Sequence, residues 1–207
     1  MMHQDCRTEI STNKWFQGKT SLSMISLLLL VGALLQGCAD GFNERLDRLF
    51  SLQLRASDLP SGWQRERGVV GRWDEEDKGI LSRTVGFLGV PERQRAGVLV
   101  TQELIDYPSA AQAEDAYPDI VQAEIPVKSW TWPEQIGFRF QADQIQVSCA
   151  QDVDSPETTS CRSVARYGNY VSIIWANVFE EQWLTMDDLE RLLESVDARM
   201  AAARDQP

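Results

Sequence analysis

Residues 161–178 read CRSVARYGNYVSIIWANV, and this stretch carries the pattern that decides the fold. At its centre, Tyr167-Gly168-Asn169-Tyr170 is typical of a tight hairpin with a two-residue turn, because such turns favour residues that adopt a positive φ. We therefore expect strands at 161–167 and 170–178 to be antiparallel neighbours.

Further strands are expected on the N-terminal side of this hairpin. The distribution of apolar and turn-forming residues predicts them at 64–73, 80–90, 97–105, 136–142 and 144–150. The aromatic segment 125–135 between them is expected to be irregular.

Helical patterns occur in three places. Apolar residues from Phe42 to Leu54 recur at helical spacing, which predicts an amphipathic helix. Pro108 stands where a middle helix is expected to start, and Pro118 is expected to kink or end it. Thr185 precedes a last helix, with a capping-box-like spacing to Asp188. The buried stripe of that last helix is expected to be Leu189, Leu192, Leu193, Val196 and Met200.

Together these elements predict the α+β class: a mainly antiparallel sheet with an N-terminal, a middle and a C-terminal helix packed on it. We expect a single α+β domain over residues 42–207, because no repeat or second domain is visible in the sequence.

The N-terminal region carries the pattern of an export signal. Residues 21–36 read SLSMISLLLLVGALLQ and follow Lys14 and Lys19, which is the order of a secretory signal. The apolar run is short for a membrane span, which needs about 20 apolar residues. An uncleaved signal anchor is the alternative interpretation.

The run ends in Leu35-Gln36-Gly37-Cys38, which resembles the lipobox of bacterial lipoproteins, although Gln36 is bulkier than most residues at its position. The resemblance implies a signal peptide over 1–37, lipidation of Cys38 and a lipidated tether over 38–41. Acyl chains would bind membrane lipid and hold the domain on the extracytoplasmic side of the cell membrane or outer membrane.

Two cysteines remain in the predicted domain, Cys149 and Cys161. An even pair in an exported domain is typical of a disulfide, here closing a polar hairpin loop between two paired strands. The alternative of two metal-ligating thiolates lacks further Cys or His ligands, so no metal and no cofactor is expected.

Charge and histidine content exclude several functions. The chain has a formal net charge of −11. The first 37 residues hold three basic and two acidic residues, so 17 basic and 29 acidic residues follow. Nucleic acid is therefore not an expected partner. The one histidine, His3, lies in the predicted signal, so histidine-dependent catalysis is not expected. We expect no catalytic residues and no enzyme.

Candidate binding residues are Trp130 and Trp132, because two indoles two residues apart on an extended segment share a face and can line a ligand groove. Packing in the core is the alternative. The acidic clusters 74–77 and 152–157 are candidates for weak Ca²⁺ binding, with solvated turns as the alternative.

The predicted domain also resembles a family. DLPSGW at 58–63, SAAQAEDAY after Tyr107, and a late Cys pair before RYGNYVSI are similar in order to the extracellular domains of PknH-like sensor kinases of actinobacteria. Those domains usually have two internal Cys pairs, whereas this chain has one. The resemblance implies a cleft that binds a small ligand, and it does not imply an enzymatic activity.

The sequence therefore predicts a membrane-anchored exported lipoprotein with a non-catalytic domain that binds a protein partner or a small ligand. An accessory subunit of a membrane protein complex is one alternative. A carboxylate-dependent envelope hydrolase is the other.

Overall fold

The computed structural model describes residues 43–66, 79–89, 98–125, 131–151, 157–179 and 184–205. The chain divides into two compact units, Met1–Arg48 and Leu49–Pro207, and residues 43–48 are the described part of the first. The predicted signal peptide, Cys38 and the tether lie outside the described residues. No helix in the described part is long and apolar enough to cross a bilayer.

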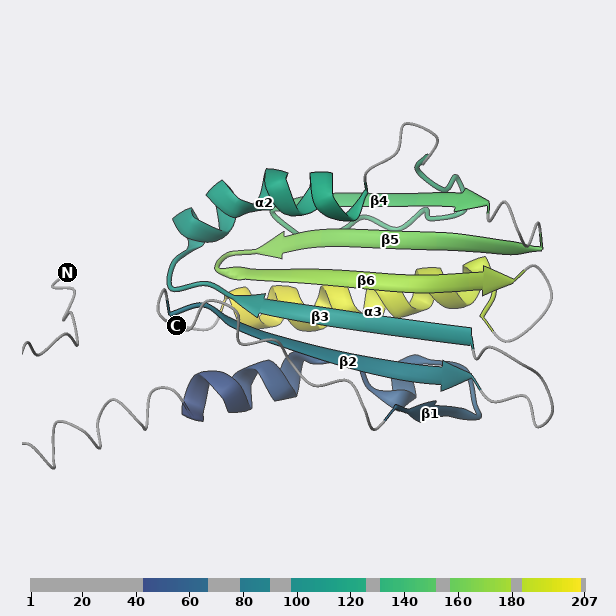
Figure 1. The fold of residues 1–207 in the computed structure, drawn as a ribbon, viewed down its shortest axis with the longest axis horizontal. Helices are drawn as coiled ribbons and strands as arrows, with labels where there is room; N and C mark the ends of the chain where they lie inside the picture. The colour runs from purple at the N-terminus through teal and green to yellow at the C-terminus, as the bar shows by residue number, and fades with distance from the viewer. Residues whose placement is uncertain are drawn as a thin grey trace, which may run out of the picture. The chain divides into compact units, whose positions relative to one another are not determined.

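Six antiparallel strands form one sheet, with the order β1-β2-β3-β6-β5-β4 (Figure 1). The strands are β1 (Trp63–Arg65), β2 (Leu81–Gly89), β3 (Val98–Asp106), β4 (Gln144–Gln151), β5 (Thr158–Tyr167) and β6 (Tyr170–Phe179). The described helices are residues 43–52, the short 3₁₀ helix η1 (Ala56–Asp58), α2 (Ala110–Glu124) and α3 (Met186–Arg204). The chain has the predicted α+β fold.

β5 and β6 form the predicted hairpin of antiparallel neighbours, and this hairpin lies between β3 and β4 in the sheet. Tyr167 pairs with Tyr170 across a two-residue turn, and Gly168 has a φ of +60°. Since β3 pairs with β6, the chain must cross the sheet after β3 to reach β4 at the far edge. Helix α2 makes that crossing.

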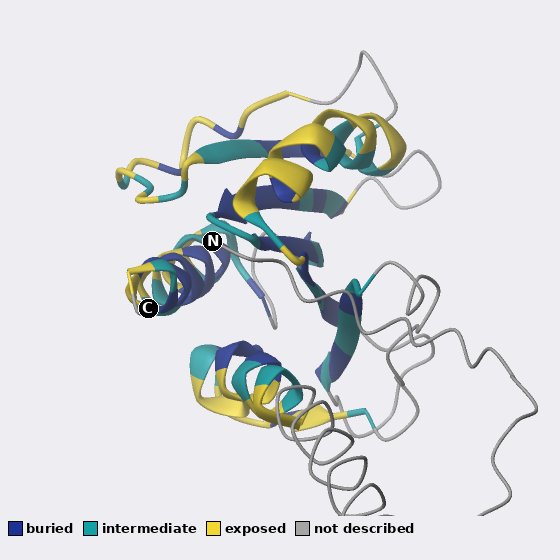
Figure 2. Ribbon diagram, turned by 90° about the vertical axis from the view of Figure 1, so that its left-hand side faces the viewer, coloured by how far each residue is buried: buried dark blue, intermediate teal, exposed yellow. Residues whose placement is uncertain are grey.

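Helices α2 and α3 cover opposite faces of the hairpin (Figure 2). On one face, Ala113 and Tyr117 of α2 pack against Val164, Val171 and Ile173. The other face carries the strand positions between these, because successive side chains of a strand alternate. There, leucines of α3 pack over the sheet, and the predicted stripe of α3 is buried (Leu189, Leu192, Leu193, Val196 and Met200).

The middle helix differs from the sequence prediction at Pro118. Of the two predicted outcomes at Pro118, a kink or an end, the end is wrong, because the helix continues to Glu124. The pyrrolidine ring is exposed, whereas Tyr117 before it and Ile120 and Val121 after it pack toward the sheet. Apolar contacts on both sides of Pro118 therefore offset the backbone hydrogen bond that proline cannot make.

Two strand predictions also need correction. Residues 136–142 form no strand. Backbone amides of this segment donate hydrogen bonds to the carboxylates of Glu190 and Asp197 on α3, and not to a neighbouring strand. The first strand was predicted over 64–73, but β1 ends at Arg65; residues 67–73 lie outside the described residues.

Candidate functional site

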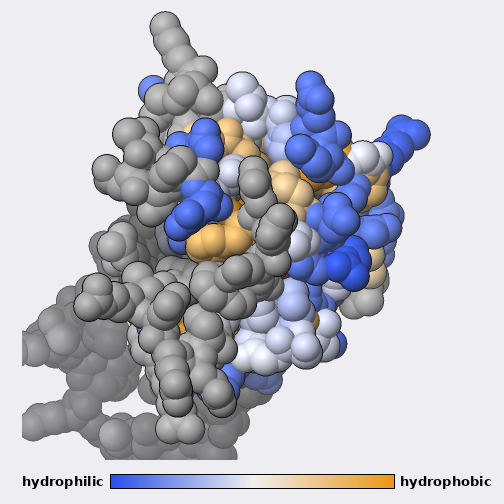
Figure 3. All heavy atoms as spheres, turned by 90° about the vertical axis from the view of Figure 1, so that its right-hand side faces the viewer, coloured by the Kyte–Doolittle hydropathy of each residue, from blue (hydrophilic) through white to orange (hydrophobic). Residues whose placement is uncertain are grey.

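One candidate site is a groove at the end of the sheet where β4 and β6 finish. Its volume is about 580 Å³. Its walls come from the segment before β4, from the ends of three strands and from the start of α3 (Thr131, Trp132, Pro133, Glu134, Gln135, Cys149, Ala150, Gln151, Thr159, Val178 and Met186). Figure 3 faces this end of the sheet, where hydrophobic surface lies among hydrophilic side chains.

Trp132 is the most exposed large apolar residue of the groove, with 42% of its surface accessible. Its ring meets the Phe140 ring edge to face, with the centroids 6.1 Å apart, and Phe140 lies 4.0 Å from Phe138. Phe140 therefore contacts the indole, and a large part of the Trp132 surface is still accessible to solvent. Aromatic rings with this partial exposure are common in ligand sites, because a ligand can still cover the open face.

The disulfide Cys149–Cys161 joins the floor of the groove to the neighbouring strand. The two residues pair directly across β4 and β5, with their Cα atoms 4.1 Å apart, which confirms the predicted bridge between paired strands. The Cys149 backbone amide donates a hydrogen bond to the Thr131 carbonyl at 2.9 Å, and the Thr131 backbone amide donates to the Cys149 carbonyl at 3.1 Å. Thr131 is the residue before Trp132. Strand β4 therefore holds Thr131 by hydrogen bonds, and the disulfide ties β4 to β5.

Helix α3 holds the rest of the Trp132 segment, which we define as residues 131–142, before β4. The Glu190 carboxylate accepts hydrogen bonds from the Gly137 and Phe138 amides, at 2.8 and 3.2 Å. The Asp197 carboxylate accepts hydrogen bonds from the backbone amide of Gln141, at 3.0 and 3.1 Å to its two oxygens. It also accepts one from the Tyr167 hydroxyl at 2.9 Å. Burial, together with the Asp197 charge, raises the pKa of Tyr167 far above its ordinary value, so the hydroxyl stays a donor.

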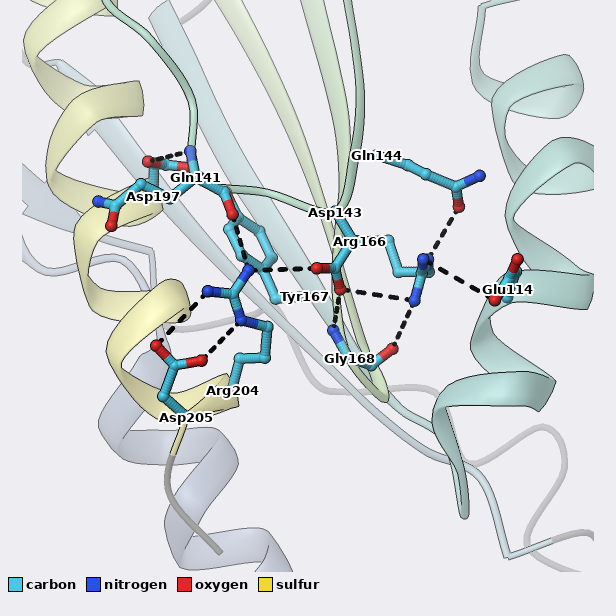
Figure 4. A network of polar contacts seen from close by, with 10 residues as sticks. All are labelled: Glu114, Gln141, Asp143, Gln144, Arg166, Tyr167, Gly168, Asp197, Arg204 and Asp205. Atoms are coloured by element: carbon cyan, nitrogen blue, oxygen red, sulfur yellow. Dashed lines mark hydrogen bonds and ion pairs between the residues drawn. The ribbon is translucent and has the colours of Figure 1, made fainter.

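A cluster of charged side chains lies at the end of the sheet opposite the groove, around the turn at Gly168 (Figure 4). Arg166, which is 9% exposed, lies 3.5 Å from the Asp143 carboxylate and donates to Gln144 at 2.8 Å. Arg204 reaches the other oxygen of Asp143 at 3.1 Å. Each of these groups is occupied by its neighbours, so the cluster fastens α3 and β5 to the start of β4.

The other tryptophans within the described part pack against the protein. Trp63 is 7% exposed and lies against Gly89, where a Cβ atom would meet its ring at 3.1 Å. The Trp175 indole donates to the Glu124 carboxylate at 2.8 Å, beneath the end of α2. Trp130, the second predicted binding residue, lies outside the described residues, as do Trp73 and Trp183.

Of the predicted calcium sites, residues 74–77 and 152–156 lie outside the described residues. Glu157 is exposed. Within the described residues, no three His, Cys, Asp or Glu side chains converge in a way that could hold a metal ion.

Sequence reasoning missed Glu190 and Asp197. They lie seven residues apart, and Arg204 follows after another seven, so all three share one flank of α3 beside its buried stripe. That spacing was visible in the sequence, but what the flank faces depends on the tertiary fold.

Comparison with models of protein families, with curated proteins and with solved structures finds no match to this chain. The resemblances to bacterial lipoproteins and to PknH-like sensor domains therefore stay predictions.

Proposed function

We propose that this chain is a lipid-anchored extracytoplasmic binding protein, whose domain binds a small amphipathic molecule in the groove beside Trp132. The observation that carries the proposal is the exposed indole of Trp132 at the rim of a groove of about 580 Å³. Ligand sites in proteins have volumes of about 300–1,000 Å³.

The lining supports an amphipathic ligand. Met186 offers apolar surface, and the buried Pro133 and Val178 also line the groove. Glu134 and Gln151 place polar groups at the same groove. Covering the open face of Trp132 would also remove exposed apolar surface from water, which favours binding by about 25 cal/mol per Å². A ligand with an apolar body and a hydrogen-bonding end fits this combination.

The anchor rests on the sequence alone. Basic residues, a short apolar run and Leu35-Gln36-Gly37-Cys38 follow one another in the order of a lipoprotein signal. The disulfide Cys149–Cys161 supports export, because such bonds persist in oxidising compartments.

The anchor is tested by the denatured mass of the native protein extracted from membranes. The expected mass is that of the chain from Cys38 onwards plus acyl groups, and Cys38→Ser should abolish the modification. A full-length unmodified mass contradicts the anchor.

Ligand binding is tested by native mass spectrometry of the same detergent extract. A small-molecule adduct should accompany the wild-type protein and disappear in Trp132→Ala. Asp115→Ala is the control, because Asp115 is exposed on α2 and does not line the groove. An adduct that persists in Trp132→Ala contradicts the groove. A second polypeptide at fixed stoichiometry, with no small adduct, would favour the accessory-subunit alternative instead.

A further inference from the structure

Two arginines, Arg65 and Arg83, lie on the neighbouring strands β1 and β2. These strands form one edge of the sheet, and β4, which lines the groove, forms the other edge. Arg65 of β1 pairs in register with Phe87 of β2, and Arg83 lies four residues before Phe87. Side chains two or four residues apart on a strand point to the same face, so Arg65 and Arg83 share the face that carries Phe87.

Neither arginine has a carboxylate partner among the described residues. The Arg83 guanidinium lies over the Phe50 ring, with its central carbon 3.2 Å from the ring centroid. Arg65 donates to the side-chain oxygen of Gln53, at 3.4 Å. By contrast, Arg166 and Arg199 are paired with aspartates. Two arginines on one face of the sheet with no carboxylate partner among the described residues are unexpected in a chain with a formal charge of −11.

Two buried hydrogen-bond donors near these arginines have no partner in the described structure. Gln53 is 4% exposed, and its amide nitrogen makes no hydrogen bond in the described structure. The Nε of Arg83 is buried and unpartnered as well. Leaving a buried donor unpaired costs about 1–3 kcal/mol, so such groups normally meet a ligand, an ion or water.

The charges of the two arginines act on one another. Burial, followed by the positive charge of Arg65, lowers the pKa of Arg83. An anion placed between the guanidinium groups would relieve this repulsion and supply an acceptor for the Gln53 amide. Guanidinium groups bind phosphate through paired hydrogen bonds, which makes arginine the common residue at such sites.

We propose that Arg65, Arg83 and the Gln53 amide form a binding site for a phosphate group. The phosphate can belong to a soluble metabolite or to a phospholipid headgroup. The lipid source rests on the proposed anchor: Phe50 follows Cys38 by only 12 residues. A chain of that length spans about 40 Å at most, so an acylated Cys38 would keep the site near the bilayer surface.

The experiment uses the full-length protein in mild detergent and two pairs of probes. Inorganic phosphate is compared with chloride at equal ionic strength, with the shift in Tm as the readout. Phosphatidylglycerol is compared with diacylglycerol, which lacks phosphate, with bound lipid counted by native mass spectrometry. Phosphate or phosphatidylglycerol should bind, and their counterparts should not.

The variants are Arg65→Met and Arg83→Met, each of which removes the charge and keeps much of the apolar stem. Either should weaken the binding at least tenfold. Arg139→Met is the matched control, because Arg139 is exposed on a different segment. Arg65 is itself exposed, so its variant should keep the wild-type unfolding transition even where Arg83→Met does not.

Each outcome decides the proposal. Binding of inorganic phosphate that both variants weaken supports a soluble source, and binding of phosphatidylglycerol alone supports a headgroup. Failure of both probes to bind the wild-type protein overturns the site, as does binding that neither substitution changes. An unmodified Cys38 would remove the argument for the lipid source and leave the phosphate test unaffected.

Discussion

Glu190 and Asp197 lie seven residues apart on α3, and both carboxylates accept backbone hydrogen bonds from the segment that also carries Trp132. The opposite flank of the helix holds the segment before β1, where Arg199 donates to the Gln53 carbonyl at 2.8 Å. Helix α3 therefore fastens irregular chain on both of its sides, while its apolar stripe covers the sheet. The position of the groove depends on this helix.

Asp197→Ala should lower the free energy of unfolding by about 1–3 kcal/mol, because the Tyr167 hydroxyl and the Gln141 amide lose their acceptor. Urea unfolding measures the loss. Glu194→Ala is the control, since Glu194 is exposed on the same helix. An equal loss in both variants would contradict the holding role of Asp197.

Trp63→Ala and Trp132→Ala should differ sharply in stability. Trp63 is 7% exposed, so its truncation should cost about 3–5 kcal/mol. Trp132 is 42% exposed and keeps an edge-to-face contact with Phe140, so its truncation should cost about 1 kcal/mol. Chemical unfolding of both variants measures the difference. A loss in Trp132→Ala as large as in Trp63→Ala would assign Trp132 to the core and remove the argument for a binding role.

The sequence was most informative where local chemistry dominates. The turn at Gly168, the cap formed by Thr185 and the stripe from Leu189 to Met200 depend on residues close together in the chain, and all three were predicted. The direct pairing of Cys149 with Cys161 followed from the same logic.

Predictions failed where distant residues decide the structure. Residues 136–142 have apolar side chains suited to a strand, yet their backbone bonds go to α3 side chains more than 50 residues later in the chain. Pro118 has a strong local signal for a helix end, but packing of α2 on the hairpin outweighs it. The pair of Arg65 and Arg83 is likewise a product of strand register, because the sequence separates them by 18 positions.

Replacing both Cys149 and Cys161 by alanine should lower the free energy of unfolding by about 3 kcal/mol. The bridge closes a short loop, with a sequence separation of 12 between the two cysteines. Without the bridge the unfolded chain gains entropy, which accounts for a loss of that size. Thermal unfolding with and without reductant measures it. Reductant should destabilise the wild-type protein by a similar amount and leave the double variant unchanged. A reductant effect on the double variant would contradict the assignment to this bridge.

The pH dependence of stability should contain a contribution from Asp58. Its carboxylate lies 2.7 Å from Arg199 and accepts from the Ser195 hydroxyl at 2.9 Å. Burial raises the pKa of Asp58, but hydrogen bonds from Arg199, the Arg55 amide and Ser195 outweigh it, and the pKa lies below the ordinary 3.8. A group with a lowered pKa stabilises the folded state fully above its unfolded pKa, and that stabilisation is lost as the pH falls through the folded pKa.

Asp58→Asn should therefore cost about 3 kcal/mol near neutral pH, because the partly buried guanidinium of Arg199 loses its counter-charge. The difference between wild type and variant should shrink as the pH falls below about 4, where the wild-type carboxyl also becomes protonated. Urea unfolding at a series of pH values measures it. Asp115→Asn, at an exposed position of α2, serves as the control and should cost little throughout. If the difference in free energy of unfolding between wild type and Asp58→Asn stays constant at every pH below about 4, the charge of Asp58 does not stabilise this contact. Hydrogen-bond geometry would then account for it.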